Sequence, residues 1–261
     1  MFLQRMVEDI PDNHLPTNWA DFNLASFSRS KTLWDYQQRA LRNALKALWK
    51  YYEDFGNCQA REGLAINRQR KRGLWQWYRN NGLPEDFSLD LSRLDHRVAS
   101  LLKEYYKADS DSLTYEHFIN RMGFWMATGS GKTLVIVKLI ELLTRLIRRG
   151  EIPDCGILFL THRDDLIEQL KRHVDEFNQV RGDFWIRLRE LREHDAVRWE
   201  NPSLFHGQEV TVFYYRSDNL LDEQKEKIVD FRKYDNNGRW YVLLDEAHKG
   251  DKEESKRQHI L

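Results

Sequence analysis

The second half of the chain alternates short apolar runs with longer segments of helical spacing. From Arg121 onward the order is GFWM, KTLVIVKLIELLTRLIRRG, GILFLT, DLIEQLKRHVDEF, VTVFYY and RWYVLLDEAH. Short apolar runs are typical of strands buried on both faces, and such strands in alternation with helices form parallel sheets. The pattern therefore predicts an α/β fold with a parallel sheet, in which GFWM is the first strand.

Residues 183–208 break this alternation. They include FWIRLRELREHDAVRWE, in which charged and apolar residues give an amphipathic pattern. We expect a helix-containing insertion between two core elements, so that VTVFYY is the third strand of the series.

The first half of the chain reads as mainly helical. Apolar residues recur at helical spacing from Leu33 to Tyr52, and Gly56 follows as a plausible stop. Residues 57–118 are predicted to form a helical insertion, because they carry an apolar stripe at the same spacing. Residues 1–31 show no sustained periodicity and are expected to be an irregular lead-in.

Within the helical insertion, RQRKRGLWQWYRN combines basic residues with tryptophans. The mixture suits contact with the phosphates and bases of nucleic acid, or docking of a partner. It also fits a solvated helix whose tryptophans face the core, because long basic side chains routinely cover aromatic surface. The sequence leaves both interpretations open.

Charge and composition narrow the class of protein. The 41 Lys and Arg residues balance 41 Asp and Glu residues, so no net positive field attracts nucleic acid and any such contact needs a local patch. Cys58 and Cys155 form no CxxC or Cys/His cluster, which argues against a disulfide framework and a structural zinc site. The apolar runs are too short for a signal peptide or a membrane span, and we expect a cytoplasmic protein without membrane contact.

The segment MATGSGKT, from Met126 to Thr133, has the composition of a phosphate-binding loop. Gly129 and Gly131 can adopt backbone angles closed to other residues, so that successive amides turn toward phosphate oxygens. A helix that begins near Lys132 adds its positive end, and the Lys132 ammonium reaches the β and γ phosphates while Thr133 coordinates Mg²⁺. The strict pattern has Gly where Met126 stands, but the groups that contact phosphate are all present.

The second chemical signal is LLDEAH, close to the end of the sequence. The apolar run from Tyr241 to Leu244 predicts a strand that delivers Asp245 and Glu246 at its carboxyl end, where α/β sheets bind ligands. Phosphoryl transfer needs one carboxylate to hold the metal and another to orient the attacking water. We therefore assign Asp245 to Mg²⁺ and Glu246 to the activation of water, with Lys132 as the third catalytic residue.

Together these motifs resemble those of superfamily 2 helicases and translocases, whose first RecA-like lobe carries a phosphate loop, a DEAH-type box and an upstream glutamine. The resemblance covers about Leu33 to the C-terminus without the insertions, and it implies a RecA-like P-loop domain of three αβα layers. Residues 32–56 and 119–261 would form this ATP-binding lobe. LWDYQQRAL is similar to the glutamine motif, which makes Gln37 the residue that reads the adenine edge. A glutamine on the surface of an amphipathic helix is the alternative.

The segment ILFLTHRDDLIEQ is similar to motif Ia of the same superfamily, where a strand end and the next helix contact the phosphate backbone of the bound strand. The resemblance assigns this contact to Thr161, His162 and Arg163. A strand end, an arginine and a helix capped by Asp165 form a reasonable phosphate site. Arg163 as an ordinary surface charge is the alternative.

The resemblance extends these assignments to the rest of the site. ATP and Mg²⁺ are the implied cofactors, and His248 of the DEAH box is implied to link the ATP site to the nucleic-acid side. The candidate nucleotide-binding residues are Gln37, Thr128, Gly129, Ser130, Gly131, Lys132 and Thr133, and the candidate metal ligands are Thr133 and Asp245.

The combination of ATGSGKT, THRDDLIEQ and DEAH looks closest to the motor subunits of type III restriction enzymes. Type I motor subunits carry a nuclease domain before the motor, and the stretch before LWDYQ is too short for one. The resemblance implies the motor part of a restriction or phage-defence endonuclease that acts on double-stranded DNA. A methyltransferase or specificity subunit is the partner that such systems imply.

The residues after Asp245 are too few for motif III, a second lobe or a nuclease domain. We therefore expect a longer polypeptide, a sheet that is incomplete at its C-terminal end, a second motor lobe beyond residue 261, and no turnover by this segment alone. The alternatives are a nucleotide-responsive lobe that binds DNA or protein without turnover, and a DNA-repair or RNA helicase of the same superfamily.

Overall fold

The computed structural model describes residues 2–53, 63–83, 88–106, 110–200, 207–221, 229–234 and 236–245. They belong to two compact units. The first unit is Met1–Phe22 with Arg39–Trp125, and the second is Asn23–Gln38 with Met126–Leu261. The two units are defined by contacts between residues. The domain boundaries predicted at residues 31, 56 and 118 stay a prediction.

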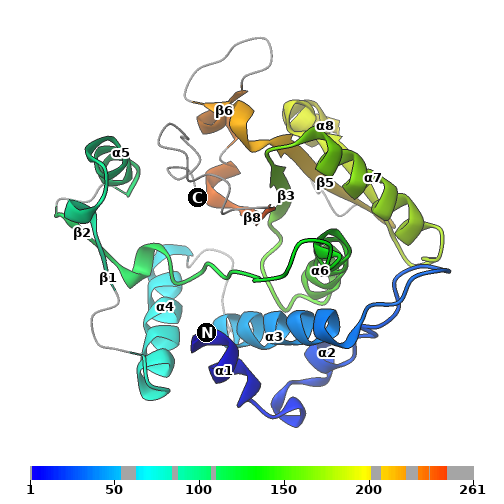
Figure 1. Cartoon of the computed structure of the whole chain (residues 1–261), viewed down its shortest axis with the longest axis horizontal. Coiled ribbons are helices and arrows are strands. Elements are labelled where there is room, and N and C mark those ends of the chain that lie inside the picture. Colours follow the sequence, from blue (N-terminus) through cyan, green and yellow to red (C-terminus); the bar gives the residue numbers. More distant parts are fainter. Residues whose placement is uncertain are drawn as a thin grey trace. The chain divides into compact units, whose positions relative to one another are not determined.

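The second unit is built on a parallel sheet of four strands in the order β4-β5-β3-β8. The strands are β3 (Gly156–Thr161), β4 (Trp185–Glu190), β5 (Glu209–Arg216) and β8 (Trp240–Leu244). In the register, Ile157 of β3 pairs with Val212 of β5 on one side and with Tyr241 of β8 on the other. Figure 1 shows β3 between β5 and β8. The predicted α/β fold with a parallel sheet is confirmed.

The two faces of the sheet carry different layers. Lys171 of α7 (Asp164–Asn178) lies over the Tyr214 ring, 5.1 Å from its centroid, so α7 covers the face to which Tyr214 points. Helix α6 (Lys132–Arg148) packs beside α7. On the opposite face Val197 of α8 (His194–Glu200) packs against an apolar cluster. That cluster contains Leu158, Leu160, Leu191, Phe213, Tyr215 and Leu220.

Helix α6 runs antiparallel to the strands, so its two ends lie at opposite edges of the sheet. Near its C-terminus, Arg148 donates a hydrogen bond to the Gly207 carbonyl, just before β5, and its guanidinium lies 5.1 Å from the Phe184 ring, just before β4. The 17 residues of α6 make a helix about 25 Å long. Its start at Lys132 therefore lies toward the carboxyl edge, where the strands end.

A buried group of charges joins residues 23–33 to α6 and its neighbours. The Glu141 carboxylate, with its side chain 5% exposed, accepts from Lys138 at 2.7 Å and from Arg145 and Arg181 at 3.1 Å. Lys138 and Arg181 also donate to the carbonyl of Ser26, at 2.7 and 3.3 Å. Burial lowers the pKa of Lys138, and the Glu141 carboxylate acts in the opposite direction. The three cations and one carboxylate form a network that depends on all its members.

The same segment makes further contacts with α7. Phe27 is fully buried and contacts the rings of Phe177 and His173, and Lys31 forms an ion pair of 2.5 Å with Glu176. These partners lie far along the sequence, where local periodicity gives no signal. The end of the predicted irregular lead-in is therefore anchored in the second unit.

The first unit contains α1 (Phe2–Glu8), the short helix α2 (Thr17–Ala20) and most of α3 (Asp35–Tyr52). Lys46 of α3 donates to the Ile10 carbonyl at 2.6 Å and forms an ion pair of 2.8 Å with Asp12. The helix predicted from the apolar spacing up to Tyr52 is confirmed, whereas its predicted stop, Gly56, lies outside the described residues. The lead-in is also more regular than predicted, since it contains α1 and α2.

The predicted helical insertion at residues 57–118 contains more than helices. Helices α4 (Gly63–Asn80) and α5 (His96–Tyr106) accompany two antiparallel strands, β1 (Ser88–Asp90) and β2 (Ser112–Thr114). Leu91, Leu102 and Leu113 form a small apolar core there. Strands of this length are too short to show an alternating pattern. No helix among the described residues combines the length and apolar character needed to cross a membrane.

The aromatic side chains of the basic helix α4 pack within the first unit. Trp75 stacks on Tyr115 with ring centroids 4.5 Å apart and an interplanar angle of 11°. The Arg70 guanidinium lies over the Tyr52 ring at 5.6 Å, and Lys71 donates to the Glu116 carbonyl at 2.5 Å. These contacts favour the interpretation of α4 as a solvated helix with inward-facing aromatic residues.

The predicted insertion at residues 183–208 is wrong in part, because it contributes strand β4 to the sheet. Arg187 and Arg189 alternate with Ile186 and Leu188, which is the period of a strand. Ile186 is also fixed by the Asn178 side chain, which accepts from its amide and donates to its carbonyl, both at 2.9 Å. The helical part of the prediction is confirmed by α8.

The predicted strand GFWM is also wrong. Residues 121–127 have no regular secondary structure, and Trp125 is 70% exposed. A strand is stable only when its backbone pairs with a neighbour, and no described strand pairs with these residues. The other predicted elements of the series correspond to α6, β3, α7, β5 and β8.

The buried charge network gives a test of the second unit's stability. Glu141→Gln leaves Lys138 and Arg181 without their carboxylate, and we expect it to lower the free energy of unfolding by about 3–5 kcal/mol. Glu168 is the matched control, because its pair with Lys171 is exposed. Glu168→Gln should cost no more than about 1 kcal/mol. Urea denaturation followed by tryptophan fluorescence measures both losses, and equal losses would contradict the role of the network.

Candidate nucleotide-binding site

The loop before α6 has the backbone shape of a phosphate cradle. Gly129 and Gly131 have φ angles of 78° and 74°, in the left-handed region that favours glycine. Gly131 is the residue that caps α6, and no side chain caps this end of the helix. The first amides of a helix have no partner within the helix. At the start of α6 the Leu134 amide donates to the Gly131 carbonyl at 3.0 Å, and the amides before it are therefore available to an anion, which the helix dipole also attracts.

Two side chains from the start of α3 hold this loop. The hydroxyl of Tyr36 and the amide Nε2 of Gln37 both donate to the Ser130 carbonyl, each at 2.8 Å. Gln37 Oε1 accepts from the Trp34 amide at 2.8 Å. A Cβ atom on Gly131 would lie 2.7 Å from Gln37 Nε2. Gln37 is thus packed directly on the loop backbone.

The burial of Gln37 excludes one of the two interpretations of its role. Its exposed fraction is 1%, so it is not a surface glutamine. Its contact with adenine stays a prediction, while its hydrogen bond to the loop is a feature that the sequence did not indicate. Tyr36 is a further loop-binding residue that sequence reasoning missed, although it lies in the LWDYQ string that drew attention to Gln37.

The polar side chains of the loop differ in exposure. Lys132 is half-buried at the first position of α6, and Thr133 is 5% exposed. Thr128 is exposed. The hydroxyl of Ser130 is buried and has no hydrogen-bond partner within the described part of the chain. A buried unpaired hydroxyl is costly, and a bound phosphate would supply its partner.

Asp245 directly follows β8 at the carboxyl edge of the sheet. Its amide donates to the Leu160 carbonyl at 2.9 Å, which continues the ladder between β8 and β3 by one residue. Asp245 is 6% exposed. Because α6 also starts toward this edge, the structure brings the carboxylate and the phosphate loop to the same edge of one sheet. Glu246 and His248 lie outside the described residues.

The three residues assigned to nucleic-acid contact have different surroundings. Thr161 is fully buried, His162 is half-buried and Arg163 is exposed. The Arg163 guanidinium donates to both carboxylate oxygens of Asp165, at 2.8 and 2.5 Å. This pairing lowers the pKa of Asp165. A phosphate that binds Arg163 would have to compete with an aspartate.

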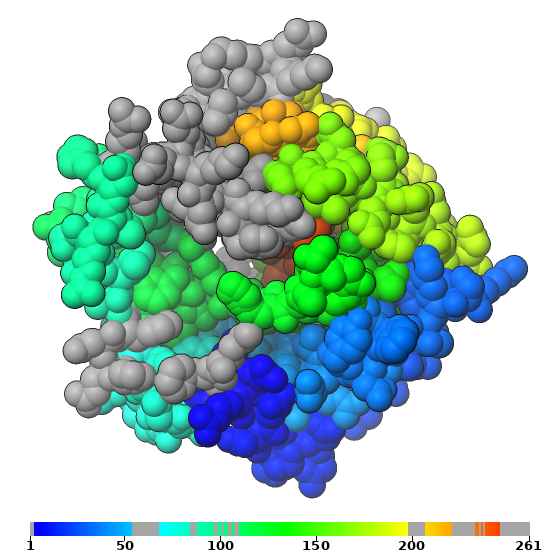
Figure 2. All heavy atoms as spheres, in the orientation of Figure 1, coloured from blue at the N-terminus to red at the C-terminus, as the bar shows by residue number. Residues whose placement is uncertain are grey.

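A second arginine neutralises the other acid at the start of α7. Arg216, the last residue of β5, forms ion pairs with Asp164 at 2.8 Å and with Asp218 at 2.5 Å. The aspartates raise the pKa of Arg216, with Asp218 as the largest cause. In Figures 1 and 2 the start of α7 adjoins the orange segment that follows β5. Pairing with arginine removes part of the negative charge that would repel a phosphate from this helix start.

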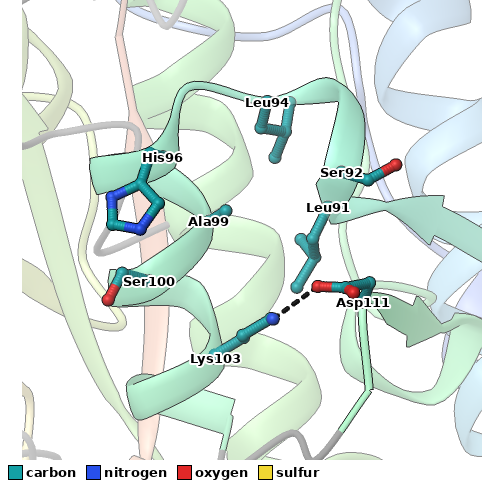
Figure 3. Close-up of a pocket in the computed structure, with 8 residues that line it drawn as sticks. All are labelled: Leu91, Ser92, Leu94, His96, Ala99, Ser100, Lys103 and Asp111. Carbon is teal, nitrogen blue, oxygen red and sulfur yellow. Dashed lines mark hydrogen bonds and ion pairs between the residues drawn. The ribbon is translucent and has the colours of Figure 1, made fainter.

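A pocket of about 280 Å³ lies in the first unit (Figure 3). Helix α5 supplies His96, Ser100 and Lys103 to its wall, and Lys103 forms an ion pair with Asp111 on the opposite side. Lys103 and Asp111 therefore neutralise each other across the pocket. None of the predicted site residues lines this pocket.

A family model described as "Type III restriction enzyme, res subunit" matches residues 30–261. The chain belongs to the type III restriction enzyme res subunit family. The match includes the glutamine segment, the phosphate loop and the DEAH segment, so the resemblance noted from the motifs is confirmed. No curated protein and no solved structure matches the chain.

Membership of the res subunit family means that the chain contains a RecA-like P-loop domain. It also implies an ATP-dependent, helicase-like motor of the kind found in restriction enzymes. The residues present fit Mg-ATP: an uncapped helix start preceded by left-handed glycines, the buried hydroxyl of Ser130, and a buried carboxylate at the same edge. Among the described residues no His, Cys, Asp and Glu cluster offers a separate metal site.

The tight contact between Gly131 and Gln37 gives a test of the loop. Gly131→Ala adds a Cβ at a left-handed position and against Gln37 Nε2, so we expect the affinity for Mg-ATP to fall at least about 10-fold, which corresponds to about 1.4 kcal/mol. Gly182→Ala is the matched control, because nothing lies near its added Cβ and its φ is not left-handed. Isothermal titration with Mg-ATP measures both affinities. A Gly131→Ala protein that binds like the control would contradict the described loop conformation.

Proposed function

We propose that this chain is the ATP-binding first lobe of a DNA-dependent ATPase, and that it drives movement on double-stranded DNA in a restriction system. One observation carries the proposal. The uncapped start of α6, with its left-handed glycines, and the buried Asp245 lie toward the same edge of one parallel sheet. This is the edge at which α/β sheets bind ligands.

Each residue of the site has a role in this proposal. The loop amides around Gly129 and Gly131, together with the Lys132 ammonium, bind the phosphates. Thr133 and Asp245 hold Mg²⁺, which neutralises phosphate charge during transfer of the terminal phosphoryl group. Glu246 orients the attacking water and accepts its proton. Gln37 and Tyr36 keep the loop in its binding shape through the Ser130 carbonyl.

The nucleic-acid side of the proposal rests on the two residues that follow β3, His162 and Arg163, and on the start of α7. Arg163 is half-exposed in its side chain and already forms a bidentate pair with a carboxylate, the geometry that also suits a phosphate. His162 lies next to it. Double-stranded DNA is the favoured substrate because the chain belongs to a family of restriction enzymes. A methyltransferase or specificity subunit is the proposed partner.

The nucleotide part of the proposal is tested by two substitutions. Lys132→Ala removes a charged hydrogen-bond donor worth about 1.5–3 kcal/mol, so the affinity for a fluorescent ATP analogue with Mg²⁺ should fall about 10- to 150-fold. Glu246→Gln should retain this affinity and abolish ATP turnover in the motor with both lobes. Lys171→Ala, which removes a lysine that pairs with Glu168, is the control for lost charge. Turnover that survives Glu246→Gln would refute the assignment of the base.

The DNA part is tested by the salt dependence of binding. Arg163→Ala should reduce the slope of log affinity against log salt by about 1, because one phosphate contact is lost. Arg172→Ala on the same helix is the control, since Arg172 is exposed but lies away from the start of α7. Fluorescence anisotropy with a labelled DNA duplex measures both slopes. A slope unchanged by Arg163→Ala would exclude this contact, and tighter binding of an RNA duplex of the same sequence would exclude DNA as the favoured substrate.

A further inference from the structure

Thr161 has a buried hydroxyl without a partner. It is the last residue of β3 and is 0% exposed, and its Oγ1 has no hydrogen-bond partner within the described residues. An unpaired hydroxyl in the interior destabilises the fold, whereas a valine of similar shape would avoid the cost. A fully buried side chain also makes no direct contact with a phosphate backbone. The position therefore needs another explanation than nucleic-acid contact.

The strand register places Thr161 beside Asp245. Leu160 pairs with Leu244, and the Asp245 amide donates to the Leu160 carbonyl, so Asp245 is the next residue along the same ladder as Thr161. Neighbouring strands are about 4.8 Å apart. Side chains at such aligned positions lie within reach of one hydrogen bond or one shared water molecule.

Alternation along the strands shows to which face both side chains point. Leu160 and Leu244 both pack in the apolar cluster on the α8 face of the sheet. Successive residues of a strand point to opposite faces, so Thr161 and Asp245 both point to the other face. That face carries α7, and α6 packs beside α7.

The polar residues near Thr161 on this face differ in whether they are already paired. Thr133, at the start of α6, is 5% exposed, and it lies toward the same edge as Asp245 and Thr161. On the other side of Thr161 the aligned residue is Arg216, whose guanidinium is engaged by Asp164 and Asp218. The Thr161 hydroxyl thus lies between an arginine that is already paired and the carboxylate proposed to hold Mg²⁺.

We propose that Thr161 is a positioning residue for the metal side of the nucleotide site. Its hydroxyl forms a hydrogen bond in the shell around the Asp245 carboxylate when Mg-nucleotide is bound, and so orients the carboxylate toward the ion. The hydroxyl is kept at a cost to the stability of the unliganded protein. This inference rests on the proposed function, and it moves Thr161 from the nucleic-acid side of the site to the metal side.

The test compares two substitutions of Thr161 with a matched control. Thr161→Val removes the hydroxyl and keeps the shape, and Thr161→Ser keeps the hydroxyl. Thr144→Val is the control, since Thr144 is equally buried but its hydroxyl donates to the Ile140 carbonyl at 2.8 Å. The measurements are the affinity for the fluorescent analogue mant-ATP with Mg²⁺ and with EDTA, and the Tm of the unliganded protein.

We expect a separation of stability from metal dependence. Thr161→Val should raise the Tm of the unliganded protein by about 2–4 °C. It should weaken the binding of mant-ATP with Mg²⁺ about 10-fold, as for other residues that orient metal ligands, and leave the binding in EDTA unchanged. In Thr161→Ser the affinity for mant-ATP should depend on Mg²⁺ as it does in the unsubstituted chain. Thr144→Val should neither raise the Tm nor change the effect of Mg²⁺ on this affinity.

Three outcomes would overturn the inference. The first is that mant-ATP binding by Thr161→Val depends on Mg²⁺ as it does in the unsubstituted chain. The second is that Thr161→Val weakens binding equally with Mg²⁺ and with EDTA, which marks a purely structural role. Loss of the dependence in Thr161→Ser would show that the hydroxyl is not the relevant group. If the unsubstituted chain itself does not bind mant-ATP with Mg²⁺, the proposed function fails first, and that failure is visible without any substitution.

Discussion

Parallel pairing is the constraint on which the rest of this structure depends. Since β3 pairs in parallel with both β5 and β8, all three strands end at one edge. Helix α6, which precedes β3, must return along the sheet in the opposite direction, so its uncapped start lies toward that same edge. The loop amides and Lys132 thereby lie toward the same edge of the sheet as the buried Asp245, which is more than a hundred residues away in the sequence.

The segment from residue 23 to residue 38 is held at both ends by hydrogen bonds to the second unit. At one end the Ser26 carbonyl accepts from Lys138 and Arg181, which share the buried Glu141 carboxylate. At the other end Gln37 and Tyr36 bind the Ser130 carbonyl of the phosphate loop. Buried charges are stable only when paired, so this network specifies the position of the segment more strictly than apolar packing alone would. The shape of the phosphate loop therefore depends on Tyr36 and Gln37 as well as on its own glycines.

At the carboxyl edge of the sheet, the residues proposed for the nucleotide and those proposed for the nucleic acid differ in burial. Asp245 and Thr161 are buried there, whereas Arg163 and Asp165 are exposed and paired with each other. A buried carboxylate suits a metal ion, and an exposed arginine suits a phosphate that arrives from solvent. In the proposed function the buried residues at the ends of β3 and β8 would therefore serve the nucleotide, and the exposed Arg163 would serve the nucleic acid.

The conformation of the loop and the strands β3, β5 and β8 could be predicted from the sequence, because each depends on a short segment of the chain. The loop requires left-handed backbone angles, which glycine adopts readily, and the apolar runs of β3, β5 and β8 indicate strands buried on both faces. Other features could not be predicted locally. Ile186 and Leu188 alternate as in a strand, yet the same residues also suit an amphipathic helix, and only pairing with β5 decides between the two. GFWM has the composition of a strand but no described neighbour with which to pair.

The sequence by itself determined which groups are candidates for the nucleotide site, since the chemistry of a glycine, a lysine or an aspartate does not depend on its position in the fold. Only the tertiary structure decided which of these groups are buried and which partners they meet. Gln37 is buried because the loop packs on it, and Thr161 is buried because its strand ends between two others. Burial and hydrogen bonding between distant residues depend on how the sheet and helices pack in space, and no local pattern records that arrangement.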